Sequence, residues 1–359
     1  MPALPSTTRE RKKDQTMDDD EQTRHGSDAN PRSDAAETQS DAYTKPRRAC
    51  YSRFGGPEVL RVEDVERPTP GPGQLLVRVA GASVNRIDLV CRAGKRRSAS
   101  GRRMPQPTGL DFAGTVTQVP PETIGFQPGQ AVWGFIGTDQ LGKNGTVADF
   151  IAVPTLAVAL APEGHNLTHL AALPLVGLTA WQGLNRIALR EGERVLIVGG
   201  AGGVGSAAIQ IAIARGAIVE TVASSRHADL VGSLGAVERY EPEAVPYSSL
   251  SGRYDALFDT AGVSLLKFRG LVRHHGGRVT TVAPNGLPAV AASRVLPGAS
   301  ISFTSVHPDQ PGLMELTKTV ASGQLKPIVS AVYPLAEISQ SHHDAEKGHA
   351  QGKRVIALR

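Results

Sequence analysis

The sequence predicts an α/β protein that combines a β-rich domain with a doubly wound parallel sheet. Its 359 residues, of which 40% are hydrophobic, correspond to about two domains at roughly 150 residues each. Across residues 49–172, short apolar runs alternate with glycine- and proline-rich breaks, a texture typical of β-structure. Across residues 173–303, apolar strands alternate with helical segments, and that alternation is typical of a parallel sheet.

The final segment resembles the first domain in texture. Residues 304–359 contain one helical stretch and then short apolar strands around a polar helix. We therefore expect residues 49–172 and 304–359 to form a single β-rich domain. The parallel-sheet domain of residues 173–303 would interrupt it in the sequence.

Residues 1–48 differ from the rest of the chain in composition. They contain no Val, Ile, Phe, Trp or Cys, and they hold 9 basic and 10 acidic residues. Folding would bury too little apolar surface to offset the lost conformational entropy, so we expect a disordered tail. An Arg-rich transit peptide is the functional alternative, but such peptides are poor in acids, whereas residues 18–21 are all acidic here.

Composition excludes several classes of protein. Two cysteines, Cys50 and Cys91, exclude a disulfide framework and fit a reducing compartment, so we expect a cytoplasmic location. No window approaches the roughly 18 consecutive apolar residues of a membrane-spanning helix, and no apolar signal core is present, so neither membrane insertion nor secretion is expected. The net charge of +5 lies in the folded part of the chain.

A glycine-rich turn follows the most apolar strand. The strand ends at Val198, and residues 199–205 read GGAGGVG before an apolar helix. Glycines let the backbone approach a pyrophosphate, which the free N–H groups and the helix dipole then bind. The context predicts a Rossmann-type dinucleotide site that includes Gly200, Gly202, Gly203 and Val204.

The end of the second strand indicates which dinucleotide binds. An NAD site has Asp or Glu at this tip to bind the ribose 2′-OH. Here the tip carries Ser224, Ser225 and Arg226, and Glu220 lies in the middle of the strand by register. Hydroxyls and a guanidinium suit a 2′-phosphate, so the sequence predicts NADPH. An ordinary polar turn is the alternative interpretation.

Further landmarks lie on both sides of the turn: 54–60 (FGGPEVL), 70–73 (PGPG), 83–88 (SVNRID), 173–181 (LPLVGLTAW), 258–262 (FDTAG) and 352–355 (GKRV). Together they resemble the medium-chain dehydrogenases/reductases, and among these the zinc-independent quinone oxidoreductase branch with zeta-crystallin-like proteins and enoyl reductases. The resemblance implies a GroES-like domain split around a Rossmann domain, with the active site between them. It also implies a homodimer that transfers hydride from NADPH to a quinone or to the conjugated C=C bond of an enone or enal.

The resemblance also implies roles for single residues. Asn85 would lie near the nicotinamide and donate a hydrogen bond to the acceptor oxygen, unless it is only a turn residue that bonds its own backbone. Val90 stands where many relatives have a tyrosine, which excludes that proton donor, and Asp88 is expected to be structural. Thr179 would touch the carboxamide and Tyr240 would flank the adenosine phosphate beside Arg226. The remaining implied cofactor contacts are Val282, Ala283, Phe303 and Lys353.

Zinc-containing relatives resemble the chain too, but the sequence argues against a metal. A catalytic zinc needs about three protein ligands. Asn85 stands where zinc members have Cys, and residues 109–111 read GLD in place of Gly-His-Glu. His165 and His169 have helical spacing but no third ligand nearby. We therefore expect no metal, and quinones and conjugated alkenes are acceptors that take hydride without a Lewis acid.

Residues 92–103 contain six basic residues and no acid. They could form a solvated flexible loop or a basic rim that steers an anionic acceptor or NADPH. Nucleic-acid binding, known among zeta-crystallin-like proteins, is the second class of function, with little or no enzymatic activity. Because the segment offers no aromatic residue to stack on bases, we do not expect a nucleic-acid partner.

Overall fold

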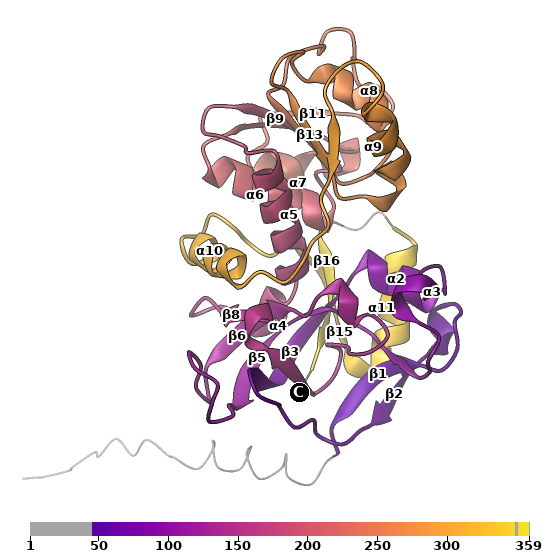
Figure 1. Cartoon of the computed structure of the whole chain (residues 1–359), viewed down its shortest axis with the longest axis vertical. Coiled ribbons are helices and arrows are strands. Elements are labelled where there is room, and N and C mark those ends of the chain that lie inside the picture. Colours follow the sequence, from indigo (N-terminus) through magenta and orange to yellow (C-terminus); the bar gives the residue numbers. More distant parts are fainter. Residues whose placement is uncertain (1–44, 349–350, 359) are drawn as a thin grey trace, which may run out of the picture. The chain divides into compact units, whose positions relative to one another are not determined.

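Three β-sheets organise the described part of the chain, residues 45–348 and 351–358 of this computed structural model (Figure 1). Most of the expected tail therefore lies outside the described residues. The folded part begins before residue 49, because the first strand starts at Arg47. Arg47 forms an ion pair with Asp149, and Arg48 forms one with Glu63. The last two residues of the expected tail are therefore part of this strand. Cys50 and Cys91 are buried and unpaired.

The GroES-like domain is built on a seven-stranded sheet with the order β15-β16-β3-β5-β6-β8, in which β7 also pairs with β3. Its strands are β3 (Gln74–Val84), β5 (Asp111–Gln118), β6 (Ala131–Phe135), β7 (Phe150–Pro154), β8 (Val158–Leu160), β15 (Val329–Pro334) and β16 (Lys353–Ala357). Strand β16 runs antiparallel to β3, so the end of the chain lies in the same sheet as its first long strand.

A small sheet and short helices complete this part of the structure. The three-stranded sheet has the order β2-β1-β4, with β1 (Arg47–Tyr51), β2 (Leu60–Asp64) and β4 (Gln106–Pro107). The helices are α2 (Arg86–Arg92), α3 (Arg97–Ser100), α4 (Leu167–Leu170) and α11 (Ile338–Glu346). Helix α2 follows β3 directly, which places its N-cap residue Asn85 at the end of the longest strand.

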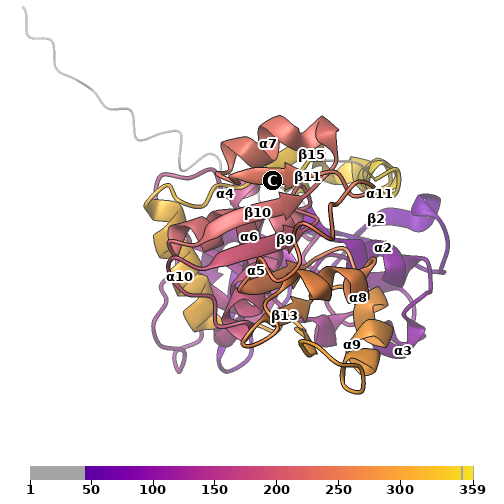
Figure 2. The ribbon, with the colours of Figure 1, turned by 90° about the horizontal axis from the view of Figure 1, so that it is seen from above.

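The Rossmann domain contains a six-stranded sheet in which every paired strand is parallel. The order is β11-β10-β9-β12-β13-β14, the order 3-2-1-4-5-6 of dinucleotide-binding folds; Figure 2 shows β9, β10 and β11 side by side. The strands are β9 (Arg194–Val198), β10 (Ile218–Val222), β11 (Glu238–Tyr240), β12 (Ala256–Asp259), β13 (Arg278–Thr281) and β14 (Ile301–Phe303). Its helices are α6 (Gly203–Ala214), α7 (Ala228–Ser233), α8 (Leu265–Phe268) and α9 (Leu287–Ser293). The predicted fold class is confirmed.

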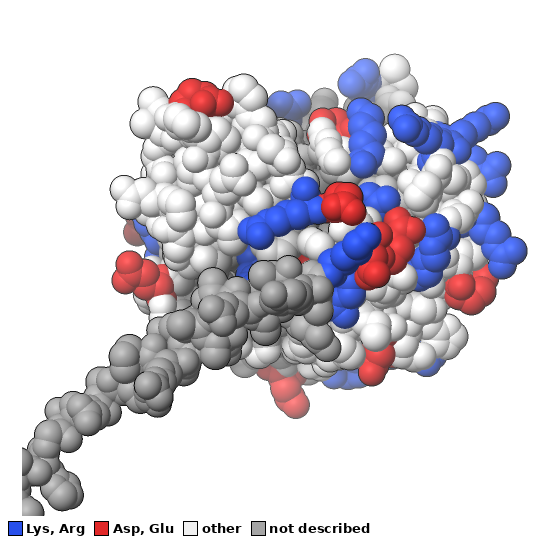
Figure 3. Space-filling model, turned by 90° about the horizontal axis from the view of Figure 1, so that it is seen from below, with Lys and Arg blue, Asp and Glu red and all other residues white. Residues whose placement is uncertain are grey.

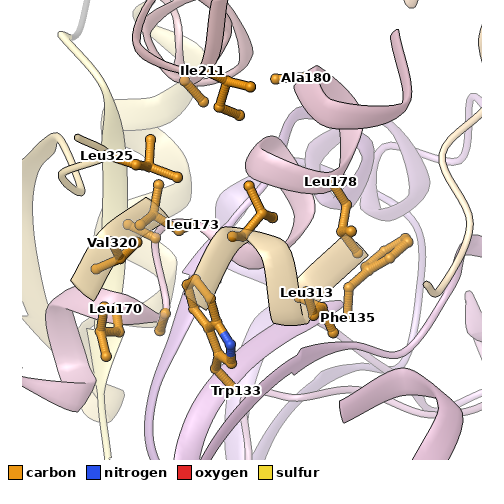
Figure 4. Close-up of a cluster of buried hydrophobic side chains, with 14 of the residues drawn as sticks. Trp133, Phe135, Leu170, Leu173, Leu178, Ala180, Ile211, Leu313, Val320 and Leu325 are labelled. Atoms are coloured by element: carbon orange, nitrogen blue, oxygen red, sulfur yellow. The ribbon is translucent and has the colours of Figure 1, made fainter. Parts of the chain in front are cut away.

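Two further helices, α5 (Pro174–Arg186) and α10 (Gln310–Ala321), share one apolar cluster with the GroES-like sheet. Figure 4 shows Trp133 and Phe135 of β6 beside Leu178 of α5 and Leu313 of α10. All four side chains are fully buried, and the Trp133 indole donates a 3.0 Å hydrogen bond to Thr317 Oγ1 on α10. Burial of this many large apolar groups is the main favourable term available to hold the helices against the sheet.

A close approach of α5 to β12 depends on Gly183. An ideal Cβ at this position would lie 2.6 Å from Cε2 and Cζ of Phe258, whose ring is fully buried. Gly183→Ala is expected to lower the free energy of unfolding by about 1–3 kcal/mol, because the added methyl overpacks the core. Urea denaturation followed by circular dichroism measures the change.

Gly232→Ala in α7 is the matched control, since an ideal Cβ there meets nothing within 4 Å. It should stabilise the protein slightly through helix propensity, by up to about 1 kcal/mol. An equal loss of stability in both variants would show that the contact with Phe258 is not the cause.

Candidate active site

The predicted cofactor residues gather at one edge of the Rossmann sheet. Parallel strands place their carboxyl ends at the same edge, and ligands of such sheets bind there. Strand β9 leads into the glycine-rich turn, β10 into Ser224, β13 into Val282, and β14 ends at Phe303. Four segments far apart in the sequence are thereby brought to one side of the sheet.

The glycine-rich turn has the geometry that a pyrophosphate requires. Gly199 has φ +86°, which favours glycine, and an ideal Cβ on Gly205 would lie 2.1 Å from Gly199 O. Gly202 is exposed, and a Cβ there would meet only Gly199 O, at 3.5 Å. The first N–H groups of α6, from Gly203 onward, have no partner within the helix. A compact turn with an open outer face and free donors fits a phosphate group.

The tip of β10 presents the residues predicted to select NADPH. Ser225 and Arg226 are exposed in the short 3-10 helix Ser225–His227, and Arg226 Nε donates a 3.3 Å hydrogen bond to Ser224 Oγ. Tyr240 ends β11 and is paired with Val222 at the end of β10, so it lies beside this tip. Its hydroxyl donates to Glu220 Oε2 at 2.7 Å.

Glu220 lies in the middle of β10, as its register predicts, and its side chain is fully buried. Burial opposes its ionisation, but hydrogen bonds from Arg253, Tyr254, Tyr240 and Arg194 lower the pKa of Glu220 to about 2. This carboxylate is therefore saturated by protein donors below the surface. It does not present itself to a ribose.

Asn85 lies in a buried polar network. Its Nδ2 donates to Asp111 Oδ1 at 2.9 Å and to Ser83 O at 3.2 Å, and its Oδ1 accepts a 2.6 Å hydrogen bond from Lys353 Nζ. Lys353 also donates to Val84 O at 2.6 Å. Both hydrogens of the Asn85 amide are thus used by the protein, so donation to an acceptor would require one of these bonds to break. Its role as a donor stays a prediction.

The network contains two buried carboxyls. Ser83 Oγ donates to both oxygens of Asp111, at 2.7 and 2.9 Å, and Asp88 Oδ2 accepts from the Asn85 backbone N–H at 2.8 Å. Burial raises the pKa of Asp111, and it raises the pKa of Asp88 to about 7 with a further contribution from the charge of Asp111. Burial lowers the pKa of Lys353, which Asp111 and Asp88 partly offset. Asp88 is thus a buried group that holds a proton near neutral pH.

Lys353 brings the two predicted halves of the site together. An ideal Cβ on Gly203 would lie 2.9 Å from Lys353 Cδ, so the lysine stem packs against the glycine-rich turn while its amine binds Asn85. The preceding residue, Gly352, donates its backbone N–H to Ala201 O at 3.3 Å. Thr179 lies on α5, and its hydroxyl donates to Leu175 O at 2.7 Å. The Leu175 N–H in turn reaches Asp111 Oδ2 at 3.4 Å.

Sequence reasoning missed Ser83 and Asp111 as partners of Asn85. In the sequence, Asp111 stands out only because it replaces the Glu of a zinc motif. Its local pattern does not predict a hydrogen bond to a residue 26 positions away. The available signal was an acid at the very start of an apolar strand segment, because an acid that becomes buried there must find donors.

Two family models of dehydrogenases match the chain. Residues 71–163 match the family model "Alcohol dehydrogenase GroES-like domain" and residues 234–356 match "Zinc-binding dehydrogenase". The chain is 30% identical to the mitochondrial NAD(P)H oxidoreductase RTN4IP1 of Mus musculus, over 85% of this chain and 87% of the relative. The chain belongs to the medium-chain dehydrogenases/reductases. The resemblance drawn from the sequence motifs is confirmed.

Two further proteins with related activities in their names are similar to this chain. The chloroplastic NADPH-dependent alkenal/one oxidoreductase of Arabidopsis thaliana is 30% identical, over 85% of this chain and 78% of the relative. The solved structure of the quinone oxidoreductase from Coxiella burnetii superimposes with a TM-score of 0.80 at 27% identity, covering 88% of this chain and 100% of that one. The chain is therefore an oxidoreductase of this superfamily and uses a nicotinamide cofactor.

One of the two matching family models is named for zinc. In residues 45–348 and 351–358, no three His, Cys, Asp or Glu side chains are grouped closely enough to hold a metal ion. Zinc independence stays a prediction for this member of the superfamily. No helix in the same ranges is long and apolar enough to cross a membrane.

The basic segment is more ordered than the expected flexible loop. Residue Arg92 ends α2, where its side chain is fully buried and pairs with Glu346, and Arg97 begins α3 with its guanidinium 4.6 Å from the centre of the Phe54 ring. The other basic residues of the segment are wholly or partly exposed. Figure 3 shows Lys and Arg gathered on the side where Figure 1 places α2, α3, β1 and β2. Steering and nucleic-acid binding stay untested.

The raised pKa of Asp88 makes stability depend on pH. Between the ordinary aspartate pKa of about 4 and about 7, the folded protein holds a proton that the unfolded chain has lost. The free energy of unfolding should therefore fall as pH rises through this window. Asp88→Asn keeps an oxygen acceptor but cannot titrate, so its decline between pH 4 and pH 7 should be smaller than that of the wild type.

Urea denaturation of both proteins at several pH values checks this. Glu122→Gln is the control, since Glu122 is an exposed carboxyl elsewhere on the surface. Identical pH profiles for the wild type and Asp88→Asn would contradict the raised pKa.

Proposed function

We propose that the chain is a zinc-independent reductase that transfers hydride from NADPH to a quinone or to the conjugated C=C bond of an enone or enal. The observation that carries the proposal is the buried amine of Lys353, 2.6 Å from Asn85 Oδ1. Asn85 and the 109–111 segment stand where zinc members have Cys and Gly-His-Glu. In its protonated form, the Lys353 amine supplies positive charge at this place and repels a metal cation. The relatives named for quinones and for alkenals or enones support the acceptor class.

The bound nicotinamide supplies the hydride. The chain's own residues position the acceptor and stabilise the charge that develops on its oxygen. The protonated Lys353 amine donates two of its N–H groups to Val84 O and Asn85 Oδ1. Its third N–H group is then available to the acceptor oxygen. Asn85, whose amide hydrogens bind Ser83 O and Asp111, acts by holding the lysine amine in place. We also propose that the protein is a homodimer and is located in the cytoplasm.

The acceptor class is tested by following NADPH oxidation with three acceptors: a naphthoquinone, a 2-alkenal and an unconjugated, saturated ketone. The quinone or the alkenal should be reduced, because each accepts hydride without a Lewis acid, and the saturated ketone should not. Activity should survive chelator treatment, and the purified protein should contain far less than one zinc per chain. Reduction of the saturated ketone alone, or loss of zinc and activity together, would contradict the proposal.

The cofactor is tested at Arg226. If its guanidinium forms charge-assisted hydrogen bonds to the 2′-phosphate, Arg226→Ala should weaken NADPH binding by about tenfold, the lower end of the range for such bonds because the side chain is exposed. NADH has no phosphate to lose, so its Michaelis constant should hardly change. Steady-state kinetics with both cofactors provide the measurement.

Arg215→Ala is the matched control, since this arginine packs over Trp181 at 4.2 Å from the ring centre. It should not change the ratio between NADPH and NADH. Equal weakening of both cofactors by Arg226→Ala would mean that the tip of β10 does not select NADPH.

A further inference from the structure

A carboxylate lies at the tip of β10 after all, and it comes from the neighbouring strand. Glu241 directly follows β11, and its Oε2 accepts a 2.8 Å hydrogen bond from the backbone N–H of Ser225 and another of 2.8 Å from Arg239 Nη1. The Ser224 side chain also contributes to lowering the pKa of this carboxylate. Glu241 therefore interacts with two of the residues predicted to hold the 2′-phosphate.

The donors around Glu241 are of the kinds that bind phosphate. A backbone N–H at the start of a helical turn, a serine hydroxyl and a guanidinium all favour a phosphate oxygen. Arg239 is held in place by a second 2.8 Å hydrogen bond, from Nη1 to Ala223 O at the tip of β10. Its side chain is only 25% exposed, whereas Arg226 is exposed and, among the described residues, has only Ser224 as a hydrogen-bond partner. Arg239 is thus the more firmly positioned cation of the two.

The charge on Glu241 opposes a phosphate at the same place. Although desolvation opposes ionisation, hydrogen bonds from Arg239 and from the Ser225 N–H hold the pKa of Glu241 below its ordinary value. The group is therefore a carboxylate at neutral pH. Like charges within a few ångströms repel, and the two anions would also compete for the same donors.

We propose that Glu241 is an internal competitor for the 2′-phosphate of NADPH, and that Arg239 is the ligand which it releases when the phosphate binds. The inference rests on the proposed use of NADPH, and it adds two specificity-determining residues to the tip of β10. The carboxylate occupies the donors of Ser225 and Arg239 in the cofactor-free protein. Binding of the phosphate exchanges one anion for another on these donors and moves the Glu241 side chain toward solvent.

The test uses two probes that differ by one phosphate, adenosine 2′,5′-bisphosphate and adenosine 5′-monophosphate, titrated into the full-length protein by calorimetry. Glu241→Gln should bind the bisphosphate about three- to tenfold more tightly than the wild type, since repulsion is removed at a partly exposed site. Binding of the monophosphate should not change. Arg239→Ala should weaken the bisphosphate alone.

Glu238→Gln is the matched control, because it makes the same charge change at the other end of β11, and the one hydrogen bond of its carboxylate within the described residues is from the backbone N–H of Arg239. It should leave both probes unaffected. Unchanged or weaker binding of the bisphosphate to Glu241→Gln would overturn the inference, as would an equal gain for both probes.

The proposed function can fail separately. A wild-type protein that binds the monophosphate as tightly as the bisphosphate would overturn the preference for NADPH. If Glu241→Gln also weakened binding of the monophosphate, Glu241 would be a ligand of the ribose hydroxyl. Both the cofactor proposal and the competitor role would then be wrong. A wild type that prefers the bisphosphate, with no effect of Glu241→Gln, would remove only the inference.

Discussion

The side chain of Lys353 connects the two parts of the site directly. Its backbone begins β16 in the GroES-like sheet, its stem packs against Gly203 of the glycine-rich turn, and its amine binds Asn85 and Val84 O. A lysine amine in so dry a place requires these partners, because an unpaired buried charge is strongly unfavourable. The position of the turn relative to Asn85 is therefore tied to one side chain.

Three buried carboxyl groups show that hydrogen-bond donors, and not burial alone, determine the pKa of an acidic side chain. Glu220 is as deeply buried as Asp111, yet its pKa falls because two arginines and two tyrosines donate to it. The pKa values of Asp88 and Asp111 rise because the cost of burial outweighs the donors and the lysine charge near them, and the charge of Asp111 raises the pKa of Asp88 further. The Glu220 cluster is therefore a fixed charge on β10, whereas the Asp88–Asp111 cluster can hold a proton next to Asn85.

The comparisons with relatives connect this geometry to the chemistry of the superfamily. The relatives named for alkenals, enones and quinones share the GroES-like and Rossmann arrangement over most of this chain. Within that arrangement, the proposed preference for NADPH rests on a few polar side chains at one strand end, and the proposed contact with the acceptor rests on groups near Asn85. Both places are formed by loops and strand ends, where substitution disturbs the hydrophobic core least.

The sequence by itself determined the fold class, the glycine-rich turn and the position of Glu220 in the middle of β10. Each of these follows from a local pattern: strand periodicity, glycines at the start of a helix, and the register of a short strand. Only the tertiary structure decided that the hydrogens of the Asn85 amide are already used, that Lys353 reaches across 268 residues to bind it, and that Glu241 lies at the tip of β10. The first two contacts join segments that are far apart in the chain, and the third joins the ends of two different strands. No periodicity encodes such contacts, because they exist only once parallel pairing and the return of β16 have placed the strands side by side.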